Sequence, residues 1–326
     1  MESRRLGRSG LVVSELSYGN RLTYRASPAC VHAALDAGIT TFHTAAAWGH
    51  GAAEKALAEG LRSARRDDVV LCTGAFWRER PNAAHAGLGR KHLTSSVHGS
   101  LRRLRTDHVD VFQLFRFDLR TPLEETFLAL SDLVRQGKIL YVGLAEWTAE
   151  QILRGAALAA EHQVPLVSNQ AHYSMLWRVP ESQVMPVAER AGMGQFGSLP
   201  LVQGILTGKY RQHRIPSGSR ADGDDESRRS VWPLLDSELL DRVELLRGVA
   251  EDAGLTMAQL AIAWVLANDN VASAVVGASR PEQVTENAQA SGVALDLDVL
   301  TRIDQLLGGL VRTDPRLTTT TTDYEE

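Results

Sequence analysis

Two histidines bracket a run of small residues in "FHTAAAWGHG", residues 42–51. His43 ends an apolar segment, and imidazole is the side chain whose ordinary pKa lies nearest to neutral pH. His43 is therefore a candidate general acid or base, and the alternative is a hydrogen-bonded filler beneath the mouth of a site. His50 follows seven residues later, and no group of His, Cys, Asp and Glu in the sequence has metal-ligand spacing. The sequence thus predicts no metal site.

Other ionisable groups stand where apolar segments give way to polar loops. They are Arg21, Arg116, Asp118, Glu146, His172 and Arg280. No two carboxylates among them occupy matched positions, so the acid pair of a glycosidase is missing. No GxSxG sequence is present for a serine hydrolase. The pattern therefore indicates neither of these hydrolase classes.

The segment "VVGASRPEQVTEN", residues 275–287, could hold a phosphate. It reads as a strand, then Ser279 and Arg280, then Pro281 at the first turn of a helix. A helix N-terminus offers free N–H groups and the positive end of a dipole, and an arginine can hold a phosphate with two hydrogen bonds. Glu286 and Asn287 could reach an adenine edge. The alternative is an ordinary capped helix, and the segment alone leaves both open.

Strand-like and helix-like segments alternate along most of the chain, and such alternation predicts a parallel sheet covered by helices. Strands are expected at 11–19, 39–44, 68–73, 109–114, 139–144, 165–169, 195–199 and 273–277. Helices are expected at 27–38, 52–63, 90–105, 122–136, 148–162, 180–191, twice within 236–268, and at 281–290. Eight strand-then-helix units fit a single-domain (β/α)8 barrel, a TIM barrel of the α/β class. No GxGxxG turn follows the first strand, which disfavours an open doubly wound sheet.

Two segments fall outside this repeat. We expect the barrel domain to cover residues 1–312, and within it a mobile polar loop at 211–230 on the carboxyl-terminal face. The polar tail at 313–326 contains too few apolar residues to pack, so disorder is expected there.

The composition limits the kind of partner. The 326 residues are 44% hydrophobic and 23% charged, with a net charge of −4, so no basic face for nucleic acid or a membrane surface is indicated. The two cysteines, Cys30 and Cys72, cannot form a disulfide framework. No apolar stretch approaches the ~20 residues of a membrane span, and the first ten residues are not a signal peptide. We expect a cytoplasmic protein with a small-molecule ligand; a homo-oligomer is left open.

Several segments resemble the aldo-keto reductase superfamily, most of all its bacterial branch related to potassium-channel β subunits. They are "RRLGRSGLVVSELSYG", "AALDAGITTFHTA", "SLRRLRTDHVDVFQL", "ETFLALSDLVRQGKILYVGLAEWTAEQI", "SNQAHYSMLWR", "LVQGILTGKY" and "GASRPEQVTEN". The resemblance is colinear over residues 3 to 310. It implies a (β/α)8 barrel with an N-terminal β-hairpin, which binds NADP(H) without a Rossmann motif and reduces carbonyls.

The resemblance also implies where a catalytic tetrad would lie. The family's aspartate falls at His43, its proton-donating tyrosine at Trp48, its lysine at Gly74 and its histidine at Phe115. An indole donates only a weakly acidic N–H, and neither Gly74 nor Phe115 can titrate. General acid catalysis is worth about 10²–10⁴-fold in rate, so the family's reaction is not expected to run by its usual route. Ala46 also stands where many members carry another aspartate.

The resemblance implies a divided cofactor site. Its adenosine-phosphate half is retained at Ser279, Arg280, Gln283, Glu286 and Asn287, with Lys209 suited to the pyrophosphate and Asn169 and Gln170 to the nicotinamide carboxamide. Three other nicotinamide contacts differ, because the family's serine falls at Ala145, its ring-stacking aromatic at Ser198 and its next serine at Leu199. We expect NADP(H) to bind with a loosely held nicotinamide.

The mouth of the predicted barrel is rich in aromatic and cationic side chains, which favours an aromatic or polycyclic ligand. The pocket residues expected are Asn20, Arg21, Trp48, His50, Phe76, Trp77, Phe115 and Arg116. Three functions remain open. The first is a repurposed enzyme with redox-neutral chemistry, such as dehydration, cyclisation, isomerisation or lyase action, within secondary metabolism. The second is an NADP(H)-dependent reductase with altered proton delivery, and the third is a non-catalytic NADP(H)-binding regulatory protein.

Overall fold

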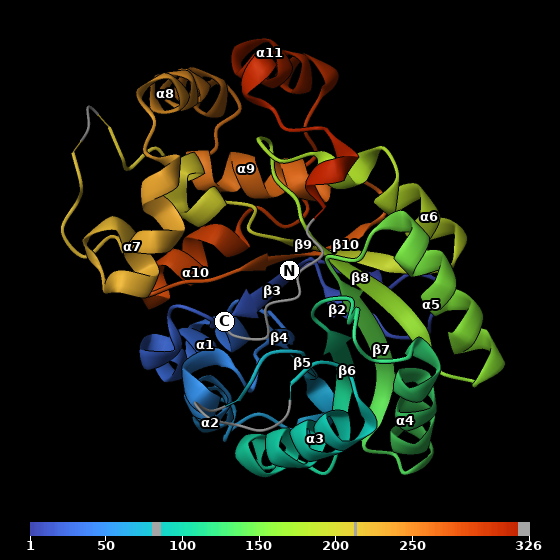
Figure 1. Ribbon diagram of the computed structural model, residues 1–326. Helices are drawn as coiled ribbons and strands as arrows, with labels where there is room; N and C mark the ends of the chain where they lie inside the picture. The colour runs from blue at the N-terminus through green and yellow to red at the C-terminus, as the bar shows by residue number, and fades with distance from the viewer. Residues whose placement is uncertain (80–85, 212–213, 319–326) are drawn as a thin grey trace.

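Eight parallel strands close into a barrel in the computed structural model, which describes residues 1–79, 86–211 and 214–318 (Figure 1). The strands are β3 (Leu16–Gly19), β4 (Thr41–His43), β5 (Val70–Ala75), β6 (Val109–Leu114), β7 (Ile139–Ala145), β8 (Leu166–His172), β9 (Gly194–Ser198) and β10 (Val271–Val276). Each pairs with the next along the chain, and β10 closes the ring against β3. The predicted (β/α)8 barrel is confirmed.

A short antiparallel hairpin covers the amino-terminal end of the barrel. Its strands are β1 (Ser3–Arg5) and β2 (Val12–Ser14), and Leu6 and Val13 are fully buried in it. The segment 11–19, predicted as one strand, is therefore divided between hairpin and barrel. The division falls at Glu15, whose carboxylate pairs with Arg4 at 2.7 Å and turns inward.

Helices surround the strands on the outside (Figure 1). They are α1 (Ser27–Asp36), α2 (Ala52–Gly60), α3 (Arg90–Leu104), α4 (Leu123–Arg135), α5 (Ala149–Glu161), α6 (Val184–Arg190), α9 (Met257–Leu266) and α10 (Pro281–Ala288). Thr148 forms the predicted capping box with Gln151 at the start of α5. The helix predicted at 180–191 begins later, at Val184, because residues 179–181 form a 3-10 turn containing Pro180.

Two further helices, α8 (Ser237–Asp252) and α11 (Leu297–Leu307), pack on each other outside α9 (Figure 1). Every residue of α9 is buried, because one side faces the barrel and the other faces this outer layer. In the part of the chain that the structure describes, no single helix is long and apolar enough to cross a membrane. Only α8 and α9 taken together pass that test, and they meet at an 84° bend.

The segment 211–230, expected to be a mobile polar loop, contains regular structure in its second half. Residues 220–222 form a 3-10 turn, and α7 (Asp225–Val231) follows, capped by the Asp224 side chain. Burial of Ala221 and Val231 ties this half to the barrel, which a polar composition does not reveal. Mobility of the segment stays a prediction. In the tail, residues 315–317 form a 3-10 turn, and 319–326 lie outside the described residues.

Candidate functional site

The parallel register brings the predicted site residues to one end of the barrel. His43 is the last residue of β4, and Phe115 and Glu146 directly follow β6 and β7. Residues 277–280 directly follow β10. The carboxyl ends of parallel strands in a closed barrel share one face, so these side chains surround a common mouth.

Three aromatic rings on that face pack against one another. The Trp77 and Phe115 rings stack with centroids 5.4 Å apart, and the Trp48 ring lies 6.1 Å from Phe115. The Arg116 guanidinium lies over the Trp77 ring at 5.2 Å. Cation–ring contacts of this kind are attractive. We call Trp48, Trp77 and Phe115 the aromatic wall.

Other predicted pocket residues face away from the mouth. Phe76 is fully buried and meets the edge of Trp77 at 5.8 Å from behind. Asn20 is also fully buried, and its Nδ2 donates to Ser27 Oγ at 3.0 Å and to the Ala53 carbonyl at 2.8 Å. Asn20 thus fastens the loop after β3 to α1 and α2 rather than presenting an amide to a ligand. His50 and Arg21 are exposed at the rim.

His43 lies inside the barrel with only 3% of its surface exposed. Its ring meets Phe196 edge-on at 4.6 Å and hydrogen-bonds the Gln170 side chain, while its Nε2 is buried without a protein partner. Burial lowers the pKa of His43 to about 3. The imidazole is therefore neutral at physiological pH, which favours the filler interpretation over a general acid.

Side-chain amides on β6 and β8 also form hydrogen bonds inside the barrel. Gln113 Nε2 donates to Gln170 Oε1 at 3.1 Å, and Asn169 Nδ2 donates to Gln195 Oε1 at 2.9 Å. Asn169 is fully buried, whereas Gln170 is half-buried and nearer to the mouth. Of the two residues assigned to a nicotinamide carboxamide, Gln170 is the more accessible.

Gly74 in β5 has no room for a side chain. A Cβ at this position would lie 2.1 Å from the Gln113 carbonyl oxygen of the paired strand. Real Cβ atoms do not approach backbone this closely, and interiors are too densely packed to relax freely. The backbone itself therefore requires glycine here.

Three cations gather on the opposite side of the mouth from the aromatic wall, around β9 and β10. Burial together with the charges of Arg220 and Arg280 lowers the pKa of the Lys209 ammonium. Arg220 also hydrogen-bonds Gln203 Oε1, and its Nη2 lies 3.5 Å from where a Cβ on Gly277 would be. No carboxylate pairs with Lys209, Arg220 or Arg280 within residues 1–79, 86–211 and 214–318. Like charges held together this way form a site for an anion.

The start of α10 completes this cationic site. Arg280 is the N-cap residue and is exposed, as is Ser279. Gln283 Oε1 accepts from the Ser279 amide at 2.9 Å, which orients the turn. Further along the helix, Glu286 is exposed and Asn287 is 6% exposed. One of the three cations, Arg280, thus stands directly before the free first-turn N–H groups of α10.

The whole chain can now be placed among known proteins. Residues 13–307 match the aldo/keto reductase family. The chain belongs to that family. A probable voltage-gated potassium channel subunit beta from Oryza sativa subsp. japonica is 37% identical over 305 residues, covering 90% of this chain and 92% of that protein. The L-glyceraldehyde 3-phosphate reductase of Escherichia coli strain K12 is 35% identical over 319 residues, covering 94% and 92%.

The sequence does not indicate Arg220 or Glu146 as site residues in this member of the aldo/keto reductase family. Arg220 stands in a polar segment without periodicity, so nothing local distinguished it from its neighbouring arginines. Glu146 was noted only as an ionisable group, although it follows a strand directly. Its backbone φ of +57° is a conformation that side chains other than glycine rarely adopt. Both positions become apparent only when the loops are placed in space.

Proposed function

We propose that this protein is an NADP(H)-binding member of the aldo/keto reductase family that does not reduce carbonyls by the family's tetrad route. The cationic site of Lys209, Arg220 and Arg280 carries the proposal. Three cations close enough to lower the pKa of a lysine are stabilised by a polyanion, and NADP(H) carries both a diphosphate and a 2′-phosphate. The family implies the nucleotide, and the donor set fits its phosphate end.

Each part of the chain has a distinct role in holding such a nucleotide. Lys209 and Arg220 would face the diphosphate, and Arg280 at the start of α10 would face the 2′-phosphate, with Ser279 and Gln283 shaping the turn. Glu286 and Asn287 would flank the adenine. Gln170 is the group nearest to a nicotinamide carboxamide. Bound nicotinamide nucleotides supply hydride transfer, but the residues at the four positions assigned to the tetrad do not fit the proton transfer of the family's route.

The residues at four positions support the proposal that the protein does not deliver a proton by the family's tetrad route. At the places assigned to the tetrad, His43 is buried and neutral, Trp48 and Phe115 belong to the aromatic wall, and Gly74 admits no side chain. No phenol or ammonium group stands at any of them. These four positions favour a regulatory role, in which the protein binds the nucleotide without turning it over. A probable potassium channel β subunit is among the similar proteins.

Calorimetric titration with NADPH and NADH tests the binding. We expect NADPH to bind and NADH to bind more weakly, since only NADPH carries the 2′-phosphate. Arg280→Ala should remove that preference, whereas Arg62→Ala, at an exposed arginine paired with Glu59, should leave it unchanged. Absence of NADPH binding would eliminate the proposal. Stopped-flow absorbance should then show no NADPH oxidation with a panel of aldehydes and ketones, and oxidation would favour a reductase with altered proton delivery.

A second candidate function is redox-neutral chemistry on an aromatic or polycyclic molecule. The aromatic wall with Arg116 above it favours this alternative, because stacked rings and a guanidinium suit a flat ligand with a polar edge. Incubating aromatic carbonyl compounds with the protein, with and without NADPH, separates the two proposals. Product that forms without nucleotide, and that Trp77→Ala abolishes, would support the second candidate. Product that forms only with NADPH would contradict it.

A further inference from the structure

A small, partly open cavity lies between the ends of β7 and β8, the segment after β8 and the C-terminal segment. Its volume is about 10 Å³, and Thr318 is among its lining residues. A single water molecule needs about 10–15 Å³ of such volume and two to four polar partners. The cavity is thus the size of one water.

Residues that line this cavity carry three polar atoms in need of a partner. Trp147 Nε1, Asn169 Oδ1 and His172 Nε2 are all buried without a protein partner. Trp147 and Asn169 are fully buried. An indole N–H can only donate and an amide oxygen can only accept, so one water in contact with both would satisfy both.

Glu146 lines the same cavity and is held there by its neighbours. Its Oε1 accepts a hydrogen bond from the His172 backbone N–H at 2.5 Å, and its left-handed backbone turns the side chain away from the direction of β7. Burial raises the pKa of the Glu146 carboxyl, although the Arg116 charge and the His172 N–H act in the opposite direction. The carboxyl is therefore a group that can hold a proton nearer to neutral pH than an exposed glutamate.

The other groups around Glu146 leave few competitors for that proton. Arg116 stays charged, and burial lowers the pKa of the His172 imidazole to about 4, so it is neutral near pH 7. The remaining lining residues come from β8, from the segment after it, from α6 and from the C-terminal segment, and they do not ionise. They are Ala171, Trp177, Val179, Pro180, Val184 and Thr318.

We propose that Glu146 is the proton-exchanging group of this mouth and that one internal water, held by Trp147, Asn169 and His172, carries its proton. In each exchange the O–H bond of Glu146 breaks as an O–H bond of the water forms, and another O–H bond of that water breaks as its proton passes to His172 Nε2; the reverse step returns both protons. No oxidant or reductant takes part. The assignment gives the mouth an acid–base group that buried His43 cannot supply. It does not depend on NADP(H) binding.

Infrared difference spectroscopy across about pH 5 to pH 8 tests the proton on Glu146. The wild-type protein should show a carboxylic-acid carbonyl band that persists above the range of exposed carboxyls. Glu146→Gln should remove this band, whereas Glu150→Gln, at an exposed carboxyl in the first turn of α5, should retain it. An unchanged band in Glu146→Gln would overturn the proposal.

Two further measurements guard against a variant that does not fold. Glu146→Asp keeps a carboxyl but withdraws it from the cavity, so the midpoint of the band should move toward lower pH. A high-resolution crystal structure of the wild-type protein should show one water bonded to Trp147 Nε1 and Asn169 Oδ1. Direct bonding between these atoms, or a dry cavity, would refute the internal water. NADPH titration is scored separately, so either proposal can fail alone.

Discussion

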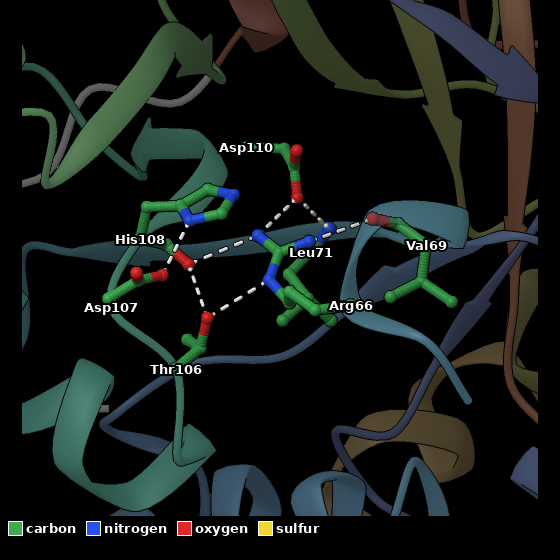
Figure 2. A network of polar contacts seen from close by, with 7 residues as sticks. All are labelled: Arg66, Val69, Leu71, Thr106, Asp107, His108 and Asp110. Atoms are coloured by element: carbon green, nitrogen blue, oxygen red, sulfur yellow. Dashed lines mark hydrogen bonds and ion pairs between the residues drawn. The ribbon is translucent and has the colours of Figure 1, made fainter. Parts of the chain in front are cut away.

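The two ends of the barrel differ in how their polar groups are paired. At the amino-terminal end, every nitrogen of the Arg66 guanidinium has an acceptor, as Figure 2 shows. Asp110 accepts from Arg66 Nη2 at 2.7 Å and from the Leu71 amide at 2.8 Å, which links the starts of β5 and β6. At the mouth, the cations Lys209, Arg220 and Arg280 lie together without a carboxylate among the described residues.

This difference separates stability from binding. In this saturated network every nitrogen of Arg66 already has an acceptor, so little capacity is left for a ligand, and the network contributes by holding strands in register. An unbalanced set of charges costs folding energy, and a ligand that restores the balance gains affinity. On this comparison we assign a structural role to the amino-terminal end of the barrel and propose the carboxyl-terminal end for binding.

The largest effect should come from breaking the saturated network. Asp110→Asn leaves the partly buried Arg66 guanidinium without its counter-charge, and such losses cost about 3–5 kcal/mol in free energy of unfolding. Urea denaturation measures the change, and NADPH affinity of the folded fraction should not move. A loss below about 1 kcal/mol, the value of an exposed pair, would contradict the assignment of this end as structural.

Removing a cation from the mouth should weaken NADPH binding without lowering the free energy of unfolding, the opposite of the result expected for Asp110→Asn. Arg220→Ala should weaken NADPH binding by about 10–100-fold, since hydrogen bonds to charged groups contribute about 1.5–3 kcal/mol. Its free energy of unfolding should stay level or rise, because repulsion with Lys209 is relieved. Calorimetry and urea denaturation of the same preparation give both numbers. If Arg220→Ala lowers the free energy of unfolding but leaves NADPH affinity unchanged, the mouth cations have a structural role and the comparison between the two ends is wrong.

The free energy of unfolding should depend on pH through the buried imidazole of His43. Its pKa is about 3 when folded and ~6.5 when unfolded, so between these values the unfolded chain binds a proton that the folded protein does not. Stability therefore falls as pH drops from about 6.5 toward 3, by up to ~1.4 kcal/mol per pH unit. His43→Gln should flatten this slope in urea denaturation at a series of pH values. His50→Gln, at the exposed rim, serves as control and should keep it.

The smallest effect is expected at the edge of the network in Figure 2. His108 Nδ1 and Asp107 Oδ1 lie 2.7 Å apart, and this hydrogen bond lowers the pKa of Asp107. Asp107 is fully exposed, and exposed pairs contribute little. Asp107→Asn should leave the urea midpoint indistinguishable from that of the wild-type protein. A clear shift would show that the saturated network extends to the surface.

The fold could be predicted from sequence because strand and helix periods alternate through the chain. Errors fell where a distant contact overrides the local pattern. Glu15 divides the first predicted strand because Arg4 draws its carboxylate inward, and α7 forms in a polar segment because Ala221 and Val231 find a buried surface. Arg4, which contacts Glu15, and the surface that buries Ala221 and Val231 both lie outside the local segment. The local sequence pattern therefore does not indicate where the strand divides or that α7 forms.

The site was predictable in position but not in orientation. In the structure His43, Phe115 and Arg280 stand at or just after the carboxyl ends of β4, β6 and β10, as the strand pattern indicates. Phe76 and Trp77 are adjacent, and only the packing decides that Trp77 joins the aromatic wall while Phe76 lies behind it. The burial that neutralises His43, and the cavity beside Glu146, depend on several strands at once, so no single segment could indicate them.

Gly74 carries a consequence for anyone who redesigns this barrel. With the Gln113 carbonyl oxygen 2.1 Å from where a Cβ would stand, no larger side chain fits at position 74 until the β5–β6 backbone has moved. An engineer who wants an ionisable group at this point of the mouth must therefore reshape the strand pair before choosing the side chain.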